Sequence, residues 1–391
     1  MGVGQRHFSS KMKRTKILEV IRQGEIGGGE SHLADLIELM DKTGYEPICL
    51  SFSDGEMITR LRKIGVKCYV VGTTRPFNIS IQHRIIQIIK DEGVTIIHAH
   101  GTRAASNVLY PSIRLGLPLV YTVHGWSFHD DQSMFTYTLR KWSEKLICHY
   151  ATRVICVSGG NAETGRKVFR LTDPIVVKNG VNLNKFYRGK KSLLRRSDFS
   201  FSDSDFVVGF IARCTKQKAP LDYLEAVRLA HHTDIRVKGL FIGEGDMDAE
   251  VDKFISANQM ESYLFRSPFR TDVADILPLM DIYCLPSLWE GLSIGLLEAM
   301  AIGCAIIATP TDGTQEVIRN EQNGLIIPFS SPGKISVAIL RLLTDENLRN
   351  RCGQNAAQLV SEQYNAQRVA DAVVDIYKNI FYKDKYWCLH E

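Results

Sequence analysis

The sequence predicts an α/β protein of two domains, each with a mostly parallel sheet covered by helices on both faces. The chain has 391 residues, of which 45% are hydrophobic and 23% charged, and this length suffices for two globular domains. Short β-rich runs alternate with helical patterns over roughly the first 170 residues, as expected for a parallel sheet. The same alternation begins again at Asp205.

A glycine loop follows the first expected strand. This strand, 16–22, leads into Gly27-Gly28-Gly29, and an amphipathic helical pattern covers 30–42. In doubly wound domains such a loop lies at the carboxyl edge of the sheet, where ligands bind. The glycines lack the G-x-G-x-x-G spacing of a dinucleotide dehydrogenase; they either let the backbone approach a ligand or form a tight turn. Further strands are expected at 46–52, 66–71, 94–99, 118–123, 153–157 and 175–178.

Histidines stand at the ends of two of these strands. His98 and His100 share one strand face, so with His124 and His129 they could form a metal cluster. No carboxylate or cysteine lies at ligand spacing, however, and hydrogen-bonded structural histidines are the simpler interpretation. His124, directly before Gly125 at a strand end, is the better catalytic candidate, with a structural role as the alternative.

Residues 134–150 form a helical pattern with an apolar stripe. We expect this stripe to face the core and the basic residues to face solvent; the alternative is that the basic side contacts a membrane surface. The stripe contains Phe135, Leu139, Trp142 and Leu146, and the basic residues are Arg140, Lys141 and Lys145.

Charge and cysteine content limit the location and the partners. The net charge of +5 is uneven, with the basic excess in residues 1–195, which suits an anionic membrane surface or a lipid-phosphate acceptor as well as ordinary solvated lysines. The nine cysteines show no C-x-x-C spacing, so we expect free thiols in the cytoplasm. Residues 1–15 are basic without an apolar core and are expected to be disordered rather than a secretory signal. No run is long enough to span a bilayer, and no nucleic-acid partner is expected.

The second half opens with a strand at 205–212 that ends in two cations. Arg213 can grip a phosphate bidentately and Lys218 can act as a point charge at the start of the helix from Pro220, which together would clamp a diphosphate; a solvated pair is the alternative. Aspartates at 203, 205, 246 and 248 are expected to cap or be solvated rather than bind metal. Further strands are expected at 237–242, 282–285, 304–309 and 323–328, with helices over 332–362 and 365–382.

The stretch 285–301 carries two glutamates eight residues apart. Glu290 is expected in a loop and Glu298 in the second turn of a helix capped by Ser293. The free N–H groups from Gly291 to Ile294 would then form an anion site. Because carboxylates repel anions, these two should bind hydroxyl groups of the same ligand, which describes a nucleotide sugar.

These motifs resemble the retaining glycosyltransferases of family 4, which have an E-x7-E motif and the GT-B fold. The resemblance covers nearly the whole chain, although Asn182 and Asp312 depart from the family pattern. It implies two Rossmann-like domains facing across a cleft: 16–184 with the acceptor, and 185–371, beginning with the linker 185–196, with the nucleotide sugar. A last helix, 372–391, would cross back onto the first domain.

The resemblance also implies roles for the site residues. His124 and Glu290 would be catalytic and orient the donor sugar, Glu298 would hold the ribose, and residues 269–273 would lie beneath the base. No metal or other cofactor is expected. The remaining donor-binding residues would be Gly28, Arg213, Lys218, Gly291, Leu292 and Ser293.

The implied function is transfer of a sugar from a UDP- or GDP-sugar to a glycan or lipid-linked acceptor, with retention of anomeric configuration, in cell-surface polysaccharide synthesis. A cytoplasmic location is expected, with contact to the inner face of the cytoplasmic membrane as an option. An inactive sugar-binding or partner subunit and a sugar-nucleotide epimerase are the alternatives.

Overall fold

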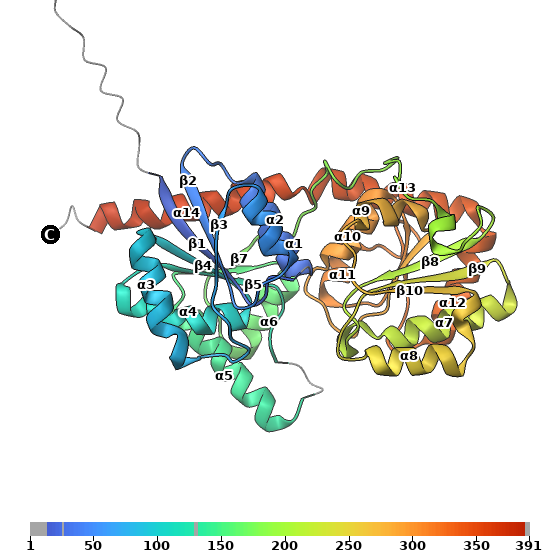
Figure 1. Ribbon diagram of the computed structural model, residues 1–391, viewed down its shortest axis with the longest axis horizontal. Helices are drawn as coiled ribbons and strands as arrows, with labels where there is room; N and C mark the ends of the chain where they lie inside the picture. The colour runs from blue at the N-terminus through green and yellow to red at the C-terminus, as the bar shows by residue number, and fades with distance from the viewer. Residues whose placement is uncertain (1–13, 26, 129–131, 388–391) are drawn as a thin grey trace, which may run out of the picture.

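The chain forms two domains, each built on one sheet (Figure 1). The computed structural model describes residues 14–25, 27–128 and 132–387, with side chains as far as Ile380. Of the basic leader expected over 1–15, residues 1–13 lie outside the described part, and Thr15 already begins the first strand. His129 also lies outside the described part.

All neighbouring strands of the first sheet run parallel, in the order β3-β2-β1-β4-β5-β6-β7. This confirms the doubly wound fold expected for the first half, because the order departs in both directions from β1. The strands are β1 (Thr15–Ile21), β2 (Tyr45–Ser51), β3 (Lys67–Val70), β4 (Ile96–His100), β5 (Leu119–Val123), β6 (Arg153–Cys156) and β7 (Ile175–Val176).

Helices connect these strands and cover the sheet. They are α1 (Gly28–Leu39), α2 (Glu56–Lys63), α3 (Gln82–Glu92), α4 (Thr102–Leu115), α5 (Met134–Tyr150) and α6 (Gly159–Phe169), with a short 3-10 turn η1 (Ile79–Ile81). Among all the helices of residues 14–25, 27–128 and 132–387, none is both long and apolar enough to cross a membrane.

The second sheet is also parallel, in the order β10-β9-β8-β11-β12-β13. Its strands are β8 (Phe206–Ile211), β9 (Val237–Ile242), β10 (Leu264–Ser267), β11 (Ile282–Leu285), β12 (Ala305–Ala308) and β13 (Leu325–Ile326). Strand β10 was not expected from the sequence. This edge strand is four residues long, contains Arg266 and is only partly buried, so it lacks the apolar run that revealed the other strands.

Helices cover the second sheet, and the last helix of the chain leaves this domain. The helices are α7 (Pro220–Thr233), α8 (Asp248–Ala257), α9 (Val273–Ile276), α10 (Ile294–Ile302), α11 (Asp312–Val317), α12 (Pro332–Thr344), α13 (Glu346–Gln363) and α14 (Ala366–Trp387), with 3-10 turns η2 (Arg196–Phe199), η3 (Lys216–Lys218), η4 (Met260–Ser262) and η5 (Leu277–Leu279).

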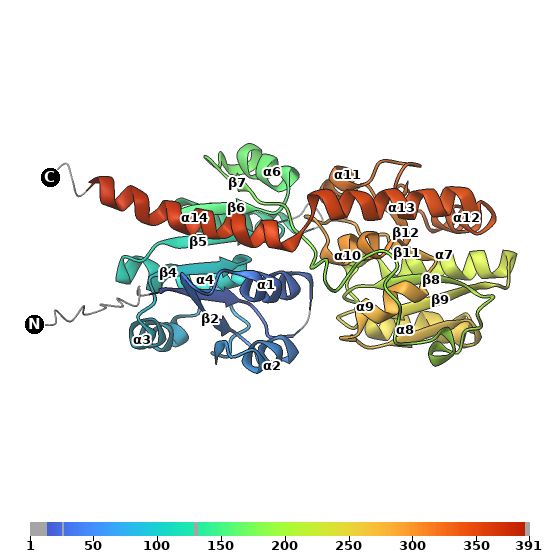
Figure 2. The same ribbon diagram turned by 90° about the horizontal axis from the view of Figure 1, so that it is seen from above.

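The last helix, α14, lies on the first domain, whereas α13 runs along the second (Figure 2). Val373, Tyr377 and Ile380 of α14 are buried in one cluster with Ile17 and Val120 of the first sheet. The end of the chain therefore closes the core of the domain in which the chain begins.

Helix α5 has the expected bounds, but the prediction that its apolar stripe faces the core was wrong. Phe135 and Trp142 are 79% and 62% exposed, whereas Glu144 and Ile147 are fully buried. The physical reason is Glu144, which accepts hydrogen bonds from the hydroxyls of Thr102 (2.7 Å) and Tyr121 (2.8 Å) and from the Ser127 amide (3.0 Å). These bonds turn the stripe outward, and α5 projects from the first domain (Figure 1).

The two domains meet at a close backbone contact. A Cβ atom on Gly291, which precedes α10, would lie 2.5 Å from the carbonyl oxygen of His124, which follows β5. Beside this contact, Asn179 Nδ2 donates a 2.6 Å hydrogen bond to the Leu292 carbonyl, and the Gly160 amide donates a 3.0 Å bond to Glu316. Only glycine allows the two loops to approach this closely.

Replacement of Gly291 by alanine tests this contact. Gly291→Ala should cost about 1–3 kcal/mol through overpacking, seen as a lower thermal midpoint, or should separate the domains, seen as a larger radius of gyration in solution scattering. Gly125→Ala is the matched control, because a Cβ there meets nothing within 4 Å. Midpoint and radius both equal to those of the control would contradict the contact.

Candidate functional site

A cavity of about 370 Å³ lies between the two domains, at the carboxyl ends of the strands of both sheets. This volume falls in the range of small-molecule sites, roughly 300–1,000 Å³. The cavity brings together most of the residues singled out in the sequence: Gly28, His124, Arg213, Lys218, Glu290, Leu292, Ser293 and Glu298 all line it. Gly291 is not on its wall, because it lies in the contact between the domains.

The N-terminus of α10 opens onto the cavity. Ser293 caps the helix, and its Oγ accepts a hydrogen bond from the Leu296 amide (3.4 Å), so the expected cap is confirmed. Ile294 and Gly295 of the first turn also line the cavity. Free amides in the first turn and the helix dipole favour an anion at this place.

Lys218 and Glu290 form an ion pair on the cavity wall. The Ser287 hydroxyl donates to the same carboxylate (3.0 Å), and Gln217 Nε2 donates to the Trp289 carbonyl (2.9 Å). The turn η3, which carries the lysine, is thereby tied to the loop that carries the glutamate. The cation expected for a diphosphate and the carboxylate expected for a sugar are therefore held side by side.

Arg213 follows β8 and adds a second cation to the wall. Arg22, which follows β1, lies near enough that its pKa is lowered, mainly by burial and then by the charge of Arg213. Arg22 also pairs with Glu30 (3.8 Å), so the cations that line the cavity at the second sheet are Arg213 and Lys218. Such a pair of cations attracts an anionic ligand.

Glu298 lies in α10 and is enclosed by protein on most sides. Burial raises its pKa to about 8, Asp35 contributes in the same direction, and Lys185 and Arg60 act against it. Its carboxyl group therefore carries a proton at neutral pH and can both donate to and accept from hydroxyl groups.

Several lining residues around Glu298 were not expected from the sequence. Asp35, Arg60 and Lys185 line the cavity and form ion pairs with one another, with Asp35 Oδ1 3.1 Å from Arg60 and 3.3 Å from Lys185. They come from α1, α2 and the linker, and each looks like an ordinary charged surface residue in the sequence. No local signal could have found them.

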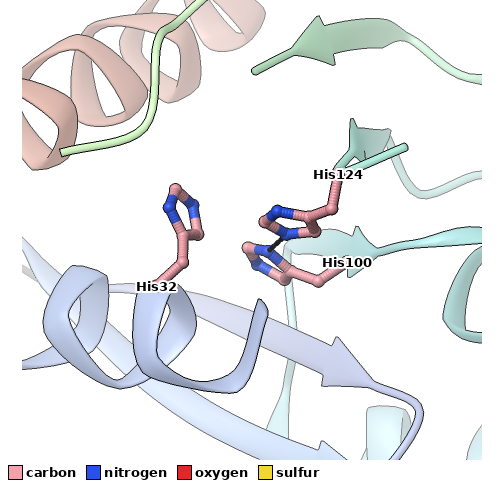
Figure 3. Close-up of side chains that lie close together, drawn as sticks. All are labelled: His32, His100 and His124. Carbon is pink, nitrogen blue, oxygen red and sulfur yellow. Dashed lines mark hydrogen bonds between the residues drawn. The ribbon is translucent and has the colours of Figure 1, made fainter. Parts of the chain in front are cut away.

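His124 reaches the cavity from the end of β5, and two other histidines lie against it (Figure 3). His100 Nδ1 is 3.3 Å from His124 Nε2, and the His32 ring packs edge-on at 4.9 Å between centroids. Burial lowers the pKa of His32 to about 3 and of His100 to about 4, and that of His124 well below its usual range, so all three imidazoles are neutral. His32 was missed, although its place three residues after Gly29 was a signal.

The grouping of histidines differs from the one considered in the sequence. His98 binds Tyr377 OH (2.5 Å) and Thr122 Oγ1 (2.7 Å) through its two ring nitrogens, which fits the structural interpretation. The ligand atoms of two sets lie within 4.8 Å of one another: those of His32, His100 and His124, and those of Glu19, His98 and His100. The second set includes a carboxylate from β1, which sequence spacing alone did not reveal.

Three further stretches that the sequence singled out can now be placed in the structure. Residues Phe269, Arg270 and Thr271 line the cavity. Asp248 begins α8, and its carboxylate accepts from the Gly245 amide (3.0 Å), while Asp205 accepts from the Ser202 amide (2.7 Å). Both aspartates thus serve local turns.

Two family models match the chain, one on each domain. Residues 26–185 match Glycosyltransferase Family 4, and residues 194–359 match Glycosyl transferases group 1. Together they cover both walls of the cavity.

Named relatives and solved structures agree with these matches. The chain is 26% identical to UDP-Gal:alpha-D-GlcNAc-diphosphoundecaprenol alpha-1,3-galactosyltransferase of Escherichia coli, over 75% of this chain and 77% of the relative. It is 30% identical to N,N'-diacetylbacillosaminyl-diphospho-undecaprenol alpha-1,3-N-acetylgalactosaminyltransferase of Campylobacter jejuni, over 60% and 62%. Its fold is similar to that of Anabaena HepE in complex with UDP-glucose, with a TM-score of 0.81, 20% identity, and coverage of 94% of this chain and 100% of that one. The two matched domains, the paired parallel sheets and the cavity between them show that the chain belongs to the family 4 glycosyltransferases of the GT-B fold.

Proposed function

We propose that the protein transfers a sugar from a UDP- or GDP-sugar to a lipid-diphosphate-linked sugar or another glycan, with retention of anomeric configuration. The observation that carries the proposal is the cavity in which the α10 N-terminus, Arg213 and Lys218 face His124 across the two domains. The names of the E. coli and C. jejuni relatives, which refer to diphosphoundecaprenol-linked sugars, support the acceptor class. A role in cell-surface polysaccharide synthesis is part of the same proposal.

The donor diphosphate would bind at the α10 N-terminus. The amides near Leu292 and Ser293, together with Arg213 and Lys218, would stabilise the charge that develops on the leaving diphosphate. This is the role that a metal ion has in other sugar transferases. We therefore propose a reaction without a required metal.

Glu290 and His124 would position the transferred sugar. A carboxylate beside the anomeric carbon favours the positive charge of an oxocarbenium-like transition state. The ion pair between Glu290 and Lys218 supports this role, because it places the carboxylate next to the cation that would hold the diphosphate. His124, being neutral, would bind a sugar hydroxyl through a hydrogen bond.

The rest of the donor would lie along the second domain. Glu298, whose carboxyl group can donate and accept, would bind the ribose hydroxyls, and the segment from Phe269 to Thr271 would lie beneath the base. Because all these groups line one cavity, an inactive sugar-binding subunit is not favoured. The epimerase alternative can be tested separately, because an epimerase would form its product without an acceptor.

Helix α5 would place the first domain on an anionic membrane. Its exposed apolar side chains are Met134, Phe135, Leu139, Trp142, Leu146 and Tyr150, and its exposed basic side chains include Arg140 and Lys145. Lys145 Nζ lies 5.1 Å from the Trp142 ring centroid, so the charge and the aromatic ring share one face. An apolar face with basic neighbours suits the boundary between headgroups and acyl chains, where a lipid-linked acceptor is found.

Removal of the cations tests the donor site. Arg213→Ala and Lys218→Ala should each lower kcat by about 10²-fold or more, because donors to the developing charge are lost. Lys334→Ala is the control, since Lys334 is exposed and does not line the cavity. Release of UDP or GDP from nucleotide sugars measures turnover, and wild-type rates in both variants would contradict the diphosphate site.

Removal of two aromatic side chains tests the membrane surface. The double variant Phe135→Ser/Trp142→Ser should bind vesicles that contain phosphatidylglycerol roughly tenfold or more weakly, because burying one such side chain is worth about 1.5–3 kcal/mol. Ile235→Ser is the matched control, since Ile235 is an apolar side chain 76% exposed on the second domain. Flotation measures binding; equal binding by double variant and control, or no binding by wild type, would contradict this role of α5.

A further inference from the structure

A buried polar network lies beneath His124, in the centre of the first sheet. Glu19 of β1 is fully buried, and so is His98, its register partner in β4; His100, two residues further, is 2% exposed. None of the three lines the cavity. A carboxylate in the middle of a strand is costly to bury unless it is hydrogen-bonded, so its partners show what it does.

The network leads from Glu19 to His124 in two hydrogen bonds. Glu19 Oε2 lies 2.9 Å from His100 Nε2, and His100 Nδ1 lies 3.3 Å from His124 Nε2 (Figure 3). The other oxygen of Glu19 accepts from Tyr377 OH (2.9 Å), which comes from α14. Among the described residues, the bond to His100 is the one side-chain hydrogen bond made by the His124 ring.

The charge states decide which atoms carry hydrogens. Burial alone would raise the pKa of Glu19, but the charge of His98 and the hydrogen bonds from His100 and His98 outweigh it and hold the pKa below its usual range. An ionised carboxylate can only accept, so His100 Nε2 must carry the hydrogen. Because burial lowers the pKa of His100 to about 4, its ring is neutral and its Nδ1 carries a lone pair.

The tautomer of His100 determines that of His124. With His100 Nδ1 as an acceptor, the 3.3 Å bond requires a hydrogen on His124 Nε2. The ring of His124 is neutral because burial lowers its pKa. Its second nitrogen, Nδ1, is then left unprotonated.

We propose that Glu19, acting through His100, holds His124 in the tautomer with hydrogen on Nε2, so that Nδ1 is an acceptor for a hydroxyl group of the donor sugar. Glu19 and His100 are positioning residues, since they do not touch the cavity. Packing also holds the His124 ring in place, because the His32 ring lies edge-on to it and a Cβ on Gly29 would be 3.8 Å from His124 Cδ2. The assignment of the ligand as a sugar hydroxyl rests on the proposed function, whereas the tautomer of His124 does not depend on it.

The test is nuclear magnetic resonance of the protein with ¹⁵N-labelled histidine, in which long-range ¹H–¹⁵N correlations identify the tautomer of each ring. Wild-type His124 is expected to show hydrogen on Nε2 alone. His100→Phe should release this preference and produce a mixture of tautomers. Thr122→Val is the matched control, because it removes a hydrogen bond of the same buried network, between Thr122 Oγ1 and His98 Nε2, but no bond of Glu19, His100 or His124. His100→Leu serves if His100→Phe does not fold, since leucine can neither donate a hydrogen bond to Glu19 nor accept one from His124.

Binding separates the tautomer from the proposed function. In His100→Phe, the affinity for a UDP- or GDP-sugar that the wild type binds should fall about tenfold, whereas the affinity for UDP or GDP alone should stay within about twofold, because only the sugar would reach His124. If no nucleotide binds the wild type, the proposed function fails while the tautomer result stands.

Three results would overturn the proposal. One is hydrogen on Nδ1 of wild-type His124, and another is an unchanged His124 tautomer in His100→Phe. The third is a joint shift of the ring nitrogens of His32, His100 and His124 on addition of Zn²⁺ at one equivalent, because these three histidines would then be a metal site.

Discussion

The contact of Gly291 with the His124 carbonyl is the constraint on which the site depends. It joins the loop after β5 to the loop before α10, and so it fixes the distance between the histidine of one domain and the helix N-terminus of the other. Asn179, near the end of the first domain, stabilises the same contact by donating a hydrogen bond to the Leu292 carbonyl. A site divided between two domains needs such a fixed point, because its parts share no secondary structure.

Around this contact, charged and neutral groups occupy different parts of the cavity wall. Cations and helix amides line the second domain, where Arg213 and Lys218 follow the first strand of its sheet. On the first domain the neutral ring of His124 lines the cavity, and the carboxylate of Glu19 lies two hydrogen bonds behind it. A ligand with a charged middle and uncharged, hydroxyl-bearing ends matches this arrangement, since its anionic part meets cations and its hydroxyls meet neutral or protonated groups.

The sequence predicted features with local causes and missed those without them. The described strands other than β10 were visible as β-rich runs, and the start of α10 was visible because Ser293 precedes a helical pattern. The stripe of α5 was placed on the wrong side, because periodicity reveals which side is apolar but not which side is covered; the bonds of Glu144 to distant residues decide that. Tyr377 meets Glu19 across 358 positions of the chain, which no local pattern encodes, although a glutamate inside the run 16–22 was a visible anomaly.

The most direct test of sugar transfer at this site is the product itself. Purified protein would be incubated with a panel of UDP- and GDP-sugars and an undecaprenyl-diphosphate-linked sugar, in the presence of EDTA. We predict release of the nucleoside diphosphate and a new glycosidic bond with the anomeric configuration of the donor, read from proton coupling constants. A bond of inverted configuration, or a product that forms only after Mn²⁺ replaces EDTA, would contradict it.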